Sequence, residues 1–436
     1  AFMDVDEETC CYIASNAIRG FENMLMNYAP DGTWYEGAYY GEINLNYISM
    51  AFSALEKTVG TLFRLDTLEG FSKASDYIRY VQSDVGCYNF ADGRSVALKT
   101  PFWAEAHFGK AADCGTIIKN GLASGTKEGL PLALLWGKTG TDSAEAELDK
   151  YYAKDEIVLL HDSFDDNQTF AGIKAGDTIY EHSQFDSGSF VFDSQGTRWG
   201  HDLGADDYNL PGYWDTADRR WDIFRMRAES HNTIVVNPDG EPDYKIGSAA
   251  PVTEFSSNTN GAVVKIDTSA LQAERLADAK RAFCFTDSRQ SLVVRDELKT
   301  LSSHARSDIY WMFYTRAEAQ IEQESGRVIL TDKSHPDRRL MIEFLSNQSF
   351  EIIYEPAKPL PGTAVVEGQD ENAGFYRLAL KISAPADTNV NITAKLTPYL
   401  IAGSSVADYD KPIKEWSIDD PKACSAFYLI GSGIHL

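Results

Sequence analysis

The spacing of apolar residues changes once along the chain, near residue 155, and this change limits the folds open to it. From residue 6 to about 153, apolar residues recur at intervals of three and four, as in Ile43, Tyr47, Met50 and Ala51. From about residue 156, short apolar or alternating runs such as IVLLH, TIYEH and DIYWMFYT are separated by Gly, Asn, Asp and Ser. The sequence therefore predicts packed helices followed by an antiparallel β-sandwich, an α+β multidomain chain.

The length of 436 residues exceeds one ordinary domain. The proline-rich stretch EPAKPLPGT, residues 355–363, interrupts the strand pattern, because proline punctuates sheets and does not join central strands. We therefore expect three parts. They are a helical domain at 1–155, a central sandwich at 156–355 and a small C-terminal β-unit at 356–436.

Charge and cysteine usage narrow the partners and the compartment. The formal net charge of −25 argues against nucleic acid or an anionic membrane as the main partner. Six cysteines without CxxC spacing indicate reduced thiols and no disulfide framework. The first residues, AFMDVDEETCCYIAS, show no export signal. These features favour a cytoplasmic location.

The stretch PDGTWYEGAYYGEINLNY, residues 30–47, is the first candidate for a binding site. It places a tryptophan, several tyrosines and two glutamates at a loop-to-helix junction. Aromatic faces stack on sugar rings, while phenol and carboxylate groups bind hydroxyls or move protons, so the stretch indicates a carbohydrate cleft. The alternative is that its aromatic residues only fill space between helices. Those residues are Trp34, Tyr35, Tyr39, Tyr40 and Tyr47.

Three potential zinc ligands stand at the ends of successive predicted strands: His182, Asp202 and His231. His201 and Asp202 are neighbours on a strand and point to opposite faces, so one of them at most enters a shared site. We choose Asp202, because a carboxylate beside two imidazoles suits Zn²⁺ with one position left for water. The alternative is that each histidine is hydrogen-bonded at the surface or in the core.

Arginines concentrate in DTADRRWDIFRMR, within an otherwise acidic chain. The cluster suits a carboxylate or a sulfate. Equally, the arginines can pair with the aspartates of the same segment. The arginines are Arg219, Arg220, Arg225 and Arg227, and the aspartates are Asp215, Asp218 and Asp222.

Two blocks of the sequence resemble a known family. PDGTWYEGAYYGE resembles the segment PDGS-x-x-EG-x-x-Y of the heparinase II/III-like polysaccharide lyases. SGSFVF, followed by GTRWGHDLGADDYNLPGY and RAESHNTIVVN, is similar to their central β-domain. The resemblance covers about residues 20–350. These lyases join an (α/α) toroid to an antiparallel β-sandwich, so the resemblance implies the same pair of domains here.

The resemblance also implies an activity, which is cleavage of a uronic-acid-containing polysaccharide, such as a glycosaminoglycan, by β-elimination. By match to the family's segment, Tyr40 is the catalytic tyrosine and Glu36 helps to shape the cleft. His182 aligns with a histidine that lines the cleft, as a second acid or base. His182, Asp202 and His231 match positions that bind zinc in some members, where we expect a structural ion.

The remaining assignments concern substrate binding. We expect Arg225 and Arg227 to clamp a carboxylate or sulfate. Tyr208 and Tyr213, in the loop ADDYNLPGYW, are candidates to cover the sugar. Trp34 and Tyr39 would face them across the cleft.

One departure from the family pattern affects the expected activity. In these lyases a further histidine or asparagine lies well upstream of the tyrosine, but only 39 residues precede Tyr40 here, and none is a histidine. We therefore expect a C-terminal fragment with a partial toroid, which is a poor catalyst as it stands.

Two other functions compete with the lyase. A glycosidase on a helical toroid would use a carboxylate pair, here Glu36 with Asp202 or Asp207. A non-catalytic glycan-binding module would bind oligosaccharide without turnover.

Overall fold

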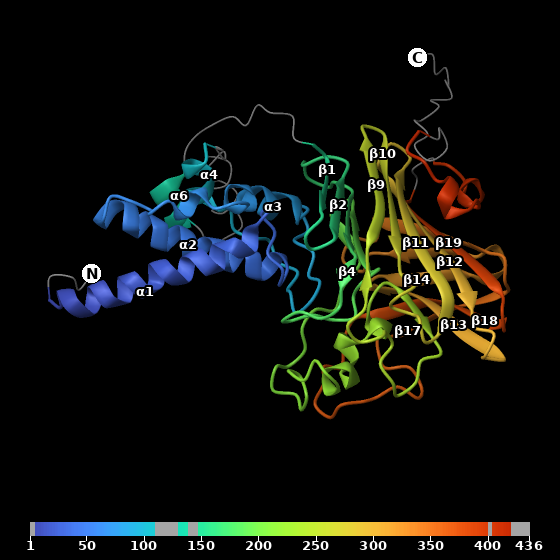
Figure 1. Cartoon of the computed structure of the whole chain (residues 1–436). Coiled ribbons are helices and arrows are strands. Elements are labelled where there is room, and N and C mark those ends of the chain that lie inside the picture. The colour runs from blue at the N-terminus through green and yellow to red at the C-terminus, as the bar shows by residue number, and fades with distance from the viewer. Residues whose placement is uncertain (1–4, 110–129, 138–146, 400–402, 420–436) are drawn as a thin grey trace, which may run out of the picture. The chain divides into compact units, whose positions relative to one another are not determined.

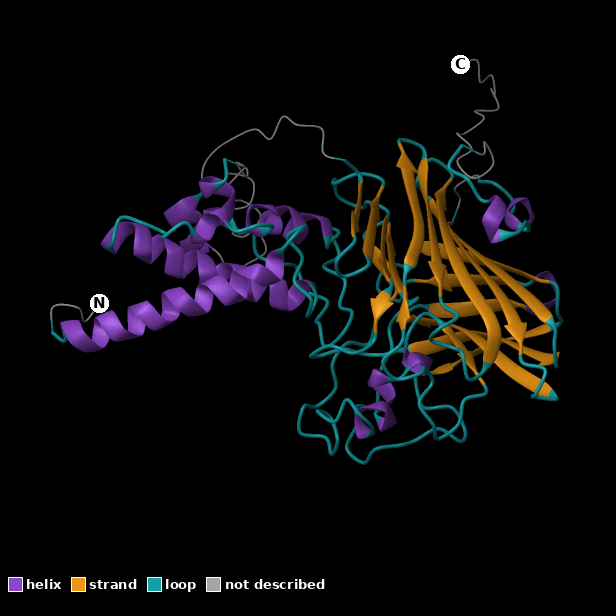
Figure 2. Ribbon diagram, in the orientation of Figure 1, coloured by secondary structure: helices purple, strands orange, loops and turns teal. Residues whose placement is uncertain are grey.

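The structure is a computed structural model that describes residues 5–109, 130–137, 147–399 and 403–419 (Figure 1). The chain divides into two compact units, one carrying the long helices and the other the strands (Figure 2). Unit 1 takes residues 1–82, 96–146 and 152–155, and unit 2 takes residues 83–95, 147–151 and 156–436. The last change from unit 1 to unit 2 thus falls where the apolar period changes.

The helices of unit 1 begin at sites that suit helix starts. The side chain of Asp6 accepts a hydrogen bond from the Thr9 N–H at 3.0 Å, which caps the first helix. Gly37 precedes the second helix with φ of 93°, a conformation that favours glycine. The described helices are α1 (Glu7–Leu25), α2 (Ala38–Thr58), α3 (Ala74–Tyr80), α4 (Phe102–His107) and α6 (Leu130–Trp136).

The buried face of α2 differs from the predicted one. Leu45, Ile48 and Phe52 are at most 1% exposed, whereas Tyr47 is 66% exposed. Phe52 makes edge-to-face contacts with other aromatic rings of unit 1, which fixes this face inward. The helix was predicted correctly and its buried side was not. The helices that the structure describes do not establish the expected toroid.

The described strands form four sheets, and every pairing among them from β2 onward is antiparallel. One sheet has the order β1 (Asp149–Tyr152), β2 (Ile157–His161), β3 (Phe170–Lys174), β5 (Phe190–Ser194) and β6 (Thr197–Gly200). The largest has the order β14 (Glu318–Glu322), β15 (Arg327–Thr331), β16 (Arg339–Ser346), β19 (Asn389–Pro398), β12 (Ser291–Thr300), β11 (Leu276–Thr286), β10 (Gly261–Asp267) and β9 (Val252–Asn258). The others are β17 (Phe350–Pro356), β18 (Tyr376–Pro385), β13 (Arg306–Thr315) and β7 (Ile234–Val236), and the pair β4 (Gly176–Asp177) and β8 (Ala249–Ala250).

One hydrophobic core joins the three larger sheets. The ring of Phe190 on β5 lies 5.6 Å from that of Phe283 on β11 and 6.0 Å from that of Phe313 on β13. All three side chains are fully buried. This packing of sheet faces confirms the predicted antiparallel sandwich.

The prediction of a separate C-terminal β-unit is wrong. Strand β18 lies between β17 and β13, and β19 lies between β16 and β12, so both are interior strands of the sandwich. The proline-rich segment is a connection from β17 to β18 of one sheet and does not divide two units. In the part of the chain that the structure describes, no helix has the length and apolar character to cross a bilayer.

Residues 83–95 belong to the strand unit, although they precede much of the helical unit in the sequence. The hydroxyl of Ser83 donates to Asp193 at 2.6 Å, and the N–H of Asn167 donates to Asp84 at 2.8 Å. These bonds attach the segment to the sheet that contains β5. It thereby brings polar side chains to the candidate site.

Candidate functional site

His182 is the centre of the candidate site in unit 2. Residues 178–182, TIYEH, form turns and no strand, and His182 has a φ of 65°, in the left-handed region. Its Nδ1 lies 3.0 Å from Oδ2 of Asp92, and its carbonyl accepts the N–H of Asp92 at 3.2 Å. The carboxylate favours a proton on Nδ1, which makes Nε2 the basic nitrogen of the neutral ring. This is the geometry of a general base with an orienting carboxylate.

Asp92 is buried and holds several partners at once. Its Oδ1 accepts a hydrogen bond from Gln184 Nε2 and another from Arg220 Nη2, each at 2.9 Å. Arg220, 1% exposed, also donates to the carbonyls of Ser183 and Tyr213 at 2.8 Å. The buried ion pair with Arg220 therefore holds the Asp92 side chain in place beside His182. Asp92 could not be selected from the sequence, since no local motif distinguishes it from the other polar residues of its loop.

Aromatic rings surround His182. The ring of Tyr208 lies 5.8 Å from the imidazole and that of Trp214 lies 5.3 Å from it. Trp214 is 52% exposed, so its face is open to a ligand. Tyr213 is buried under the Arg220 guanidinium, and burial raises the pKa of its phenol. Tyr208 therefore remains a predicted sugar contact, Tyr213 is a packing residue, and Trp214 is a further candidate that was not selected from the sequence.

Asp202 and His231 form a second pair. Oδ2 of Asp202 lies 2.8 Å from Nδ1 of His231, and Oδ1 accepts the Gly204 N–H at 2.7 Å. Gly204 has a φ of +68°, and a Cβ there would meet the carbonyl oxygen of Gly93 at 2.6 Å. Burial lowers the pKa of His231 and the Asp202 carboxylate raises it, with a net rise. The pair fixes the loop after β6 against residues 83–95.

The three predicted zinc ligands do not come together. Among the described residues, no group of three His, Cys, Asp or Glu side chains is arranged to hold a metal. His182 binds Asp92, because its segment is a turn and does not end a strand beside Asp202. Nε2 of His231 is buried without a hydrogen-bond partner among the described residues. Asp202, which is bound to Nδ1 of the same ring, orients this nitrogen.

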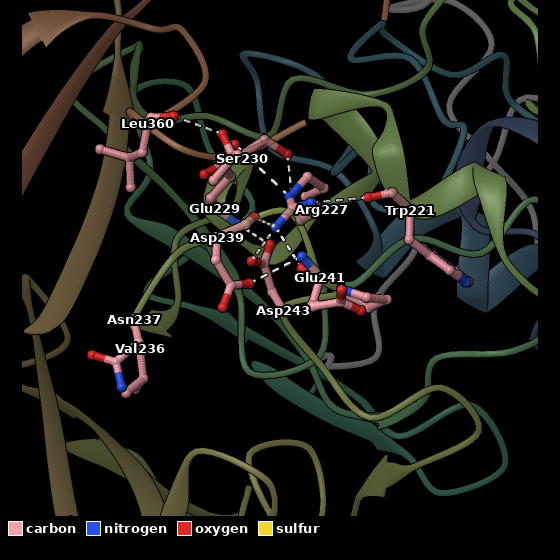
Figure 3. Close-up of polar contacts among 12 residues, drawn as sticks. Trp221, Arg227, Glu229, Ser230, Val236, Asn237, Asp239, Glu241, Asp243 and Leu360 are labelled. Atoms are coloured by element: carbon pink, nitrogen blue, oxygen red, sulfur yellow. Dashed lines mark hydrogen bonds and ion pairs between the residues drawn. The ribbon is translucent and has the colours of Figure 1, made fainter. Parts of the chain in front are cut away.

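Arg227 is a structural residue and not a substrate clamp. Figure 3 shows its guanidinium enclosed by oxygen atoms, and the side chain is 0% exposed. It donates to Asp243 Oδ1 at 2.7 Å and to the carbonyls of Asp239 and Glu241 at 3.0 and 2.9 Å. Three arginines of the cluster therefore pair with acids outside the segment that was considered: Arg220 with Asp92, Arg225 with Asp370 and Arg227 with Asp243.

The guanidinium nitrogens of Arg225 are also bound by other residues of the protein. Its Nε donates to Asn372 Oδ1 at 2.8 Å, its Nη1 donates to the carbonyl of Ala205 at 2.6 Å, and its Nη2 lies 3.1 Å from Asp370. These contacts join the loop after β6 to the loop before β18. Both predicted clamps are therefore wrong, because their donors are already used by the protein.

Glu229 adds an ionisable group to the Arg227 cluster (Figure 3). Its Oε1 lies 3.9 Å from Arg227 Nε, and its side chain is 0% exposed. Burial and the neighbouring charge of Asp243 raise the pKa of Glu229 to about 7. The carboxyl group thus titrates near neutral pH inside the sandwich.

The first candidate stretch lies in unit 1 at the start of α2. Trp34 is 5% exposed, and its Nε1 donates to Glu36 Oε2 at 2.7 Å. Trp34 is thus a packing residue that orients Glu36. Tyr39 and Tyr40 occupy the first turn of α2, half-buried, with ring centroids 5.4 Å apart. These two tyrosines and Glu36 remain accessible enough to contact a ligand.

Comparison with known proteins identifies the domain that carries His182. Residues 160–364 match the family described as "Heparinase II/III-like, C-terminal". A solved structure of a heparinase III gene product superposes with a TM-score of 0.63 at 14% identity, covering 87% of this chain and 55% of the other. The heparan sulfate lyase HepC from Pedobacter heparinus superposes with a TM-score of 0.61 at 15% identity, covering 87% and 55%.

The present chain thus spans about half the length of these solved proteins. At such identities the superpositions show a shared fold. No curated protein sequence matches the chain.

Proposed function

We propose, from the match of residues 160–364 to the heparinase II/III-like C-terminal family, that this chain acts as part of a polysaccharide lyase. Its substrate would be an acidic polysaccharide that contains uronic acid, cleaved by β-elimination. The observation that carries the proposal is the imidazole of His182 held by the buried carboxylate of Asp92. An imidazole oriented by a carboxylate in this way is an arrangement that general acid–base catalysis uses.

The reaction sets three tasks. Charge on the uronate carboxylate must be withdrawn, so that the C5 proton becomes acidic. A base must remove that proton, and an acid must protonate the departing 4-oxygen. The C5–H bond breaks, a C4–C5 double bond forms and the C4–O bond breaks, so no water is consumed.

His182 and Tyr40 are the proton-transfer groups in this proposal. With Nδ1 bound to Asp92, Nε2 of His182 takes up or delivers a proton. Tyr40 supplies a phenol from the first turn of α2. Trp214 and Tyr208 present aromatic faces beside the imidazole, where a sugar ring can stack.

The glycosidase alternative finds less support. An inverting or retaining pair needs one carboxyl group with a raised pKa to act as acid. Asp207 is exposed, and hydrogen bonds from the backbone and side chain of Asn209 lower its pKa. Asp202 is bound to His231 and to the Gly204 N–H.

Product analysis tests the proposal. The chain is incubated with a panel of uronic-acid polysaccharides, and both ultraviolet absorbance and new reducing ends are followed. We expect the two signals to rise together, because elimination leaves a conjugated unsaturated uronate. Reducing ends without absorbance would indicate a hydrolase. Binding of an oligosaccharide with neither signal would indicate a glycan-binding module.

A further inference from the structure

A pocket in unit 2 has a lining that includes none of His182, Asp92 or Tyr208. It has a volume of about 460 Å³, within the size range of small-ligand sites. The residues in and around β6, the link from β13 to β14 and the turn between β15 and β16 form most of its walls. The lining residues are Val85, Gly196, Thr197, Arg198, His201, Arg316, Ala317, Asp332, Lys333, Ser334, His335 and Gly374.

Two cationic side chains of this pocket form no ion pair with a described carboxylate. Arg316 and Lys333 are exposed, and within the described chain neither forms an ion pair. Aromatic rings support both: the Arg316 guanidinium lies 4.1 Å from the ring centroid of Phe375, and Lys333 Nζ lies 4.3 Å from that of Tyr376. Cation–π contacts of this kind restrain the charged groups without neutralising them.

The other charged groups of the lining are already engaged. Asp332 is the one carboxylate among the described lining residues, and it accepts hydrogen bonds from the Thr197 hydroxyl and from the N–H groups of Ser334 and His335. Arg198 is saturated by Asp193, Ser95 and backbone carbonyls. The net charge offered to a ligand is therefore positive, although the whole chain carries −25.

His201 adds a neutral polar contact. Its ring meets Phe375 edge-on at 5.4 Å, and burial, with the charges of Arg198 and Arg316, lowers its pKa to about 3. The imidazole is thus uncharged at neutral pH and can hydrogen-bond without repelling the cations. Exposed Ser334 provides a hydroxyl at the rim.

We propose that this pocket binds a sulfate or carboxylate group of an acidic oligosaccharide, with Arg316 and Lys333 as its charged contacts. The anion chemistry follows from the lining alone. The choice of a glycan as the source of the anion rests on the proposed function. Such a site would hold a part of the polysaccharide away from the bond that is cleaved.

Binding is measured by isothermal titration in a Tyr40→Phe background, which prevents turnover. The probes are a sulfated heparin hexasaccharide, an unsulfated hyaluronan hexasaccharide and sodium sulfate alone. Arg316→Gln/Lys333→Gln should weaken the heparin probe by about 10-fold or more, because two charge-assisted contacts are lost. The matched control is Arg306→Gln/Lys245→Gln, which removes the same charge from exposed positions outside the pocket. It should bind like the parent.

Several outcomes would overturn the proposal. Equal affinity of the pocket variant and the control would show that Arg316 and Lys333 hold no anion. Binding of sodium sulfate but of neither hexasaccharide would overturn the glycan as the source. So would equally tight binding of a single-stranded oligonucleotide that depends on the same two residues. A missing lyase product changes none of these equilibrium results, so failure of the proposed function is distinguishable.

Discussion

Nδ1 of His182 lies 3.0 Å from Oδ2 of Asp92, although 90 residues separate them in the sequence. The carboxylate comes from the segment 83–95 and the imidazole from a turn before β5. The same carboxylate binds Arg220. In the proposed function, Asp92 would therefore serve both the orientation of His182 and the stability of the fold, and variants must separate the two effects.

Asp92→Asn should lower both turnover and stability. The unfolding free energy should fall by about 3 kcal/mol, because the buried Arg220 charge loses its partner. Turnover should fall by about 10-fold or more with KM little changed, because His182 loses the group that orients it. Denaturant titration and the absorbance assay measure the two effects.

The double variant Asp92→Asn/Arg220→Met is the control for this prediction. Removing both charges should recover part of the lost stability but none of the turnover. If turnover returns together with stability, Asp92 serves only the fold.

Tyr40→Phe should lower turnover by about 10²-fold or more while oligosaccharide binding is retained, since the hydroxyl is lost and the aromatic face is kept. The matched control is Tyr12→Phe, at an exposed position of α1 outside the candidate site. We expect it to turn over normally. Equal rates for the two variants and the parent would make Tyr40 a packing residue.

Arg227→Met should destabilise the protein by about 3–5 kcal/mol, because the buried carboxylate of Asp243 loses its charged partner. Arg219→Met, at an exposed position nearby, should change the unfolding free energy by about 0.5 kcal/mol or less. Chemical denaturation gives both values. A fully stable Arg227→Met protein with weakened glycan binding would instead restore the predicted clamp.

Glu229 predicts a pH dependence of stability. Its pKa is raised in the folded state from an ordinary 4.5 to about 7, so the native protein binds more protons than the unfolded chain in this interval. Stability should therefore fall as pH rises from about 4.5 through about 7. Glu229→Gln should flatten this part of the curve, whereas exposed Glu324→Gln should not. Parallel curves for Glu229→Gln and the parent would contradict the assignment.

Zinc at His182, Asp202 and His231 remains a prediction, which no cluster of metal ligands among the described residues supports. If the three side chains converge around an ion, elemental analysis of purified protein should find zinc near one ion per chain, lost in both His231→Ala and His182→Ala. A parent protein without zinc, and without a rise in melting temperature when zinc is added, would end the prediction.

The strands could be predicted from the sequence because their signal is local. IVLLH matches the bounds of β2, and DIYWMFYT lies within β13. The helix α2 was equally evident, but its buried face depended on aromatic partners elsewhere in unit 1. The spacing of apolar residues alone does not show which side of a helix packs against those partners.

The candidate site was only partly predictable, because its contacts are long-range. His182, Asp202 and His231 were selected as ligand types, yet their partners were set by turns and by loop packing. Asp92 lies 128 residues from Arg220, and no local sequence pattern around either residue indicates that the two pair. Likewise, the arginine cluster was visible, while Asp243 and Asn372 became its partners only in the folded chain.

Segment 83–95 has a consequence for anyone who transplants this domain. A gene fragment that starts at residue 156 would encode β2 and the later strands but omit Asp92, Asn89 and Ser83, which bind His182, the Asp202 carbonyl and Asp193. A chimera between two such proteins would therefore need to exchange two separate segments, residues 83–95 and the sandwich, to keep His182 with its partners. In any such chimera, residues 83–95 and the sandwich should come from the same parent protein.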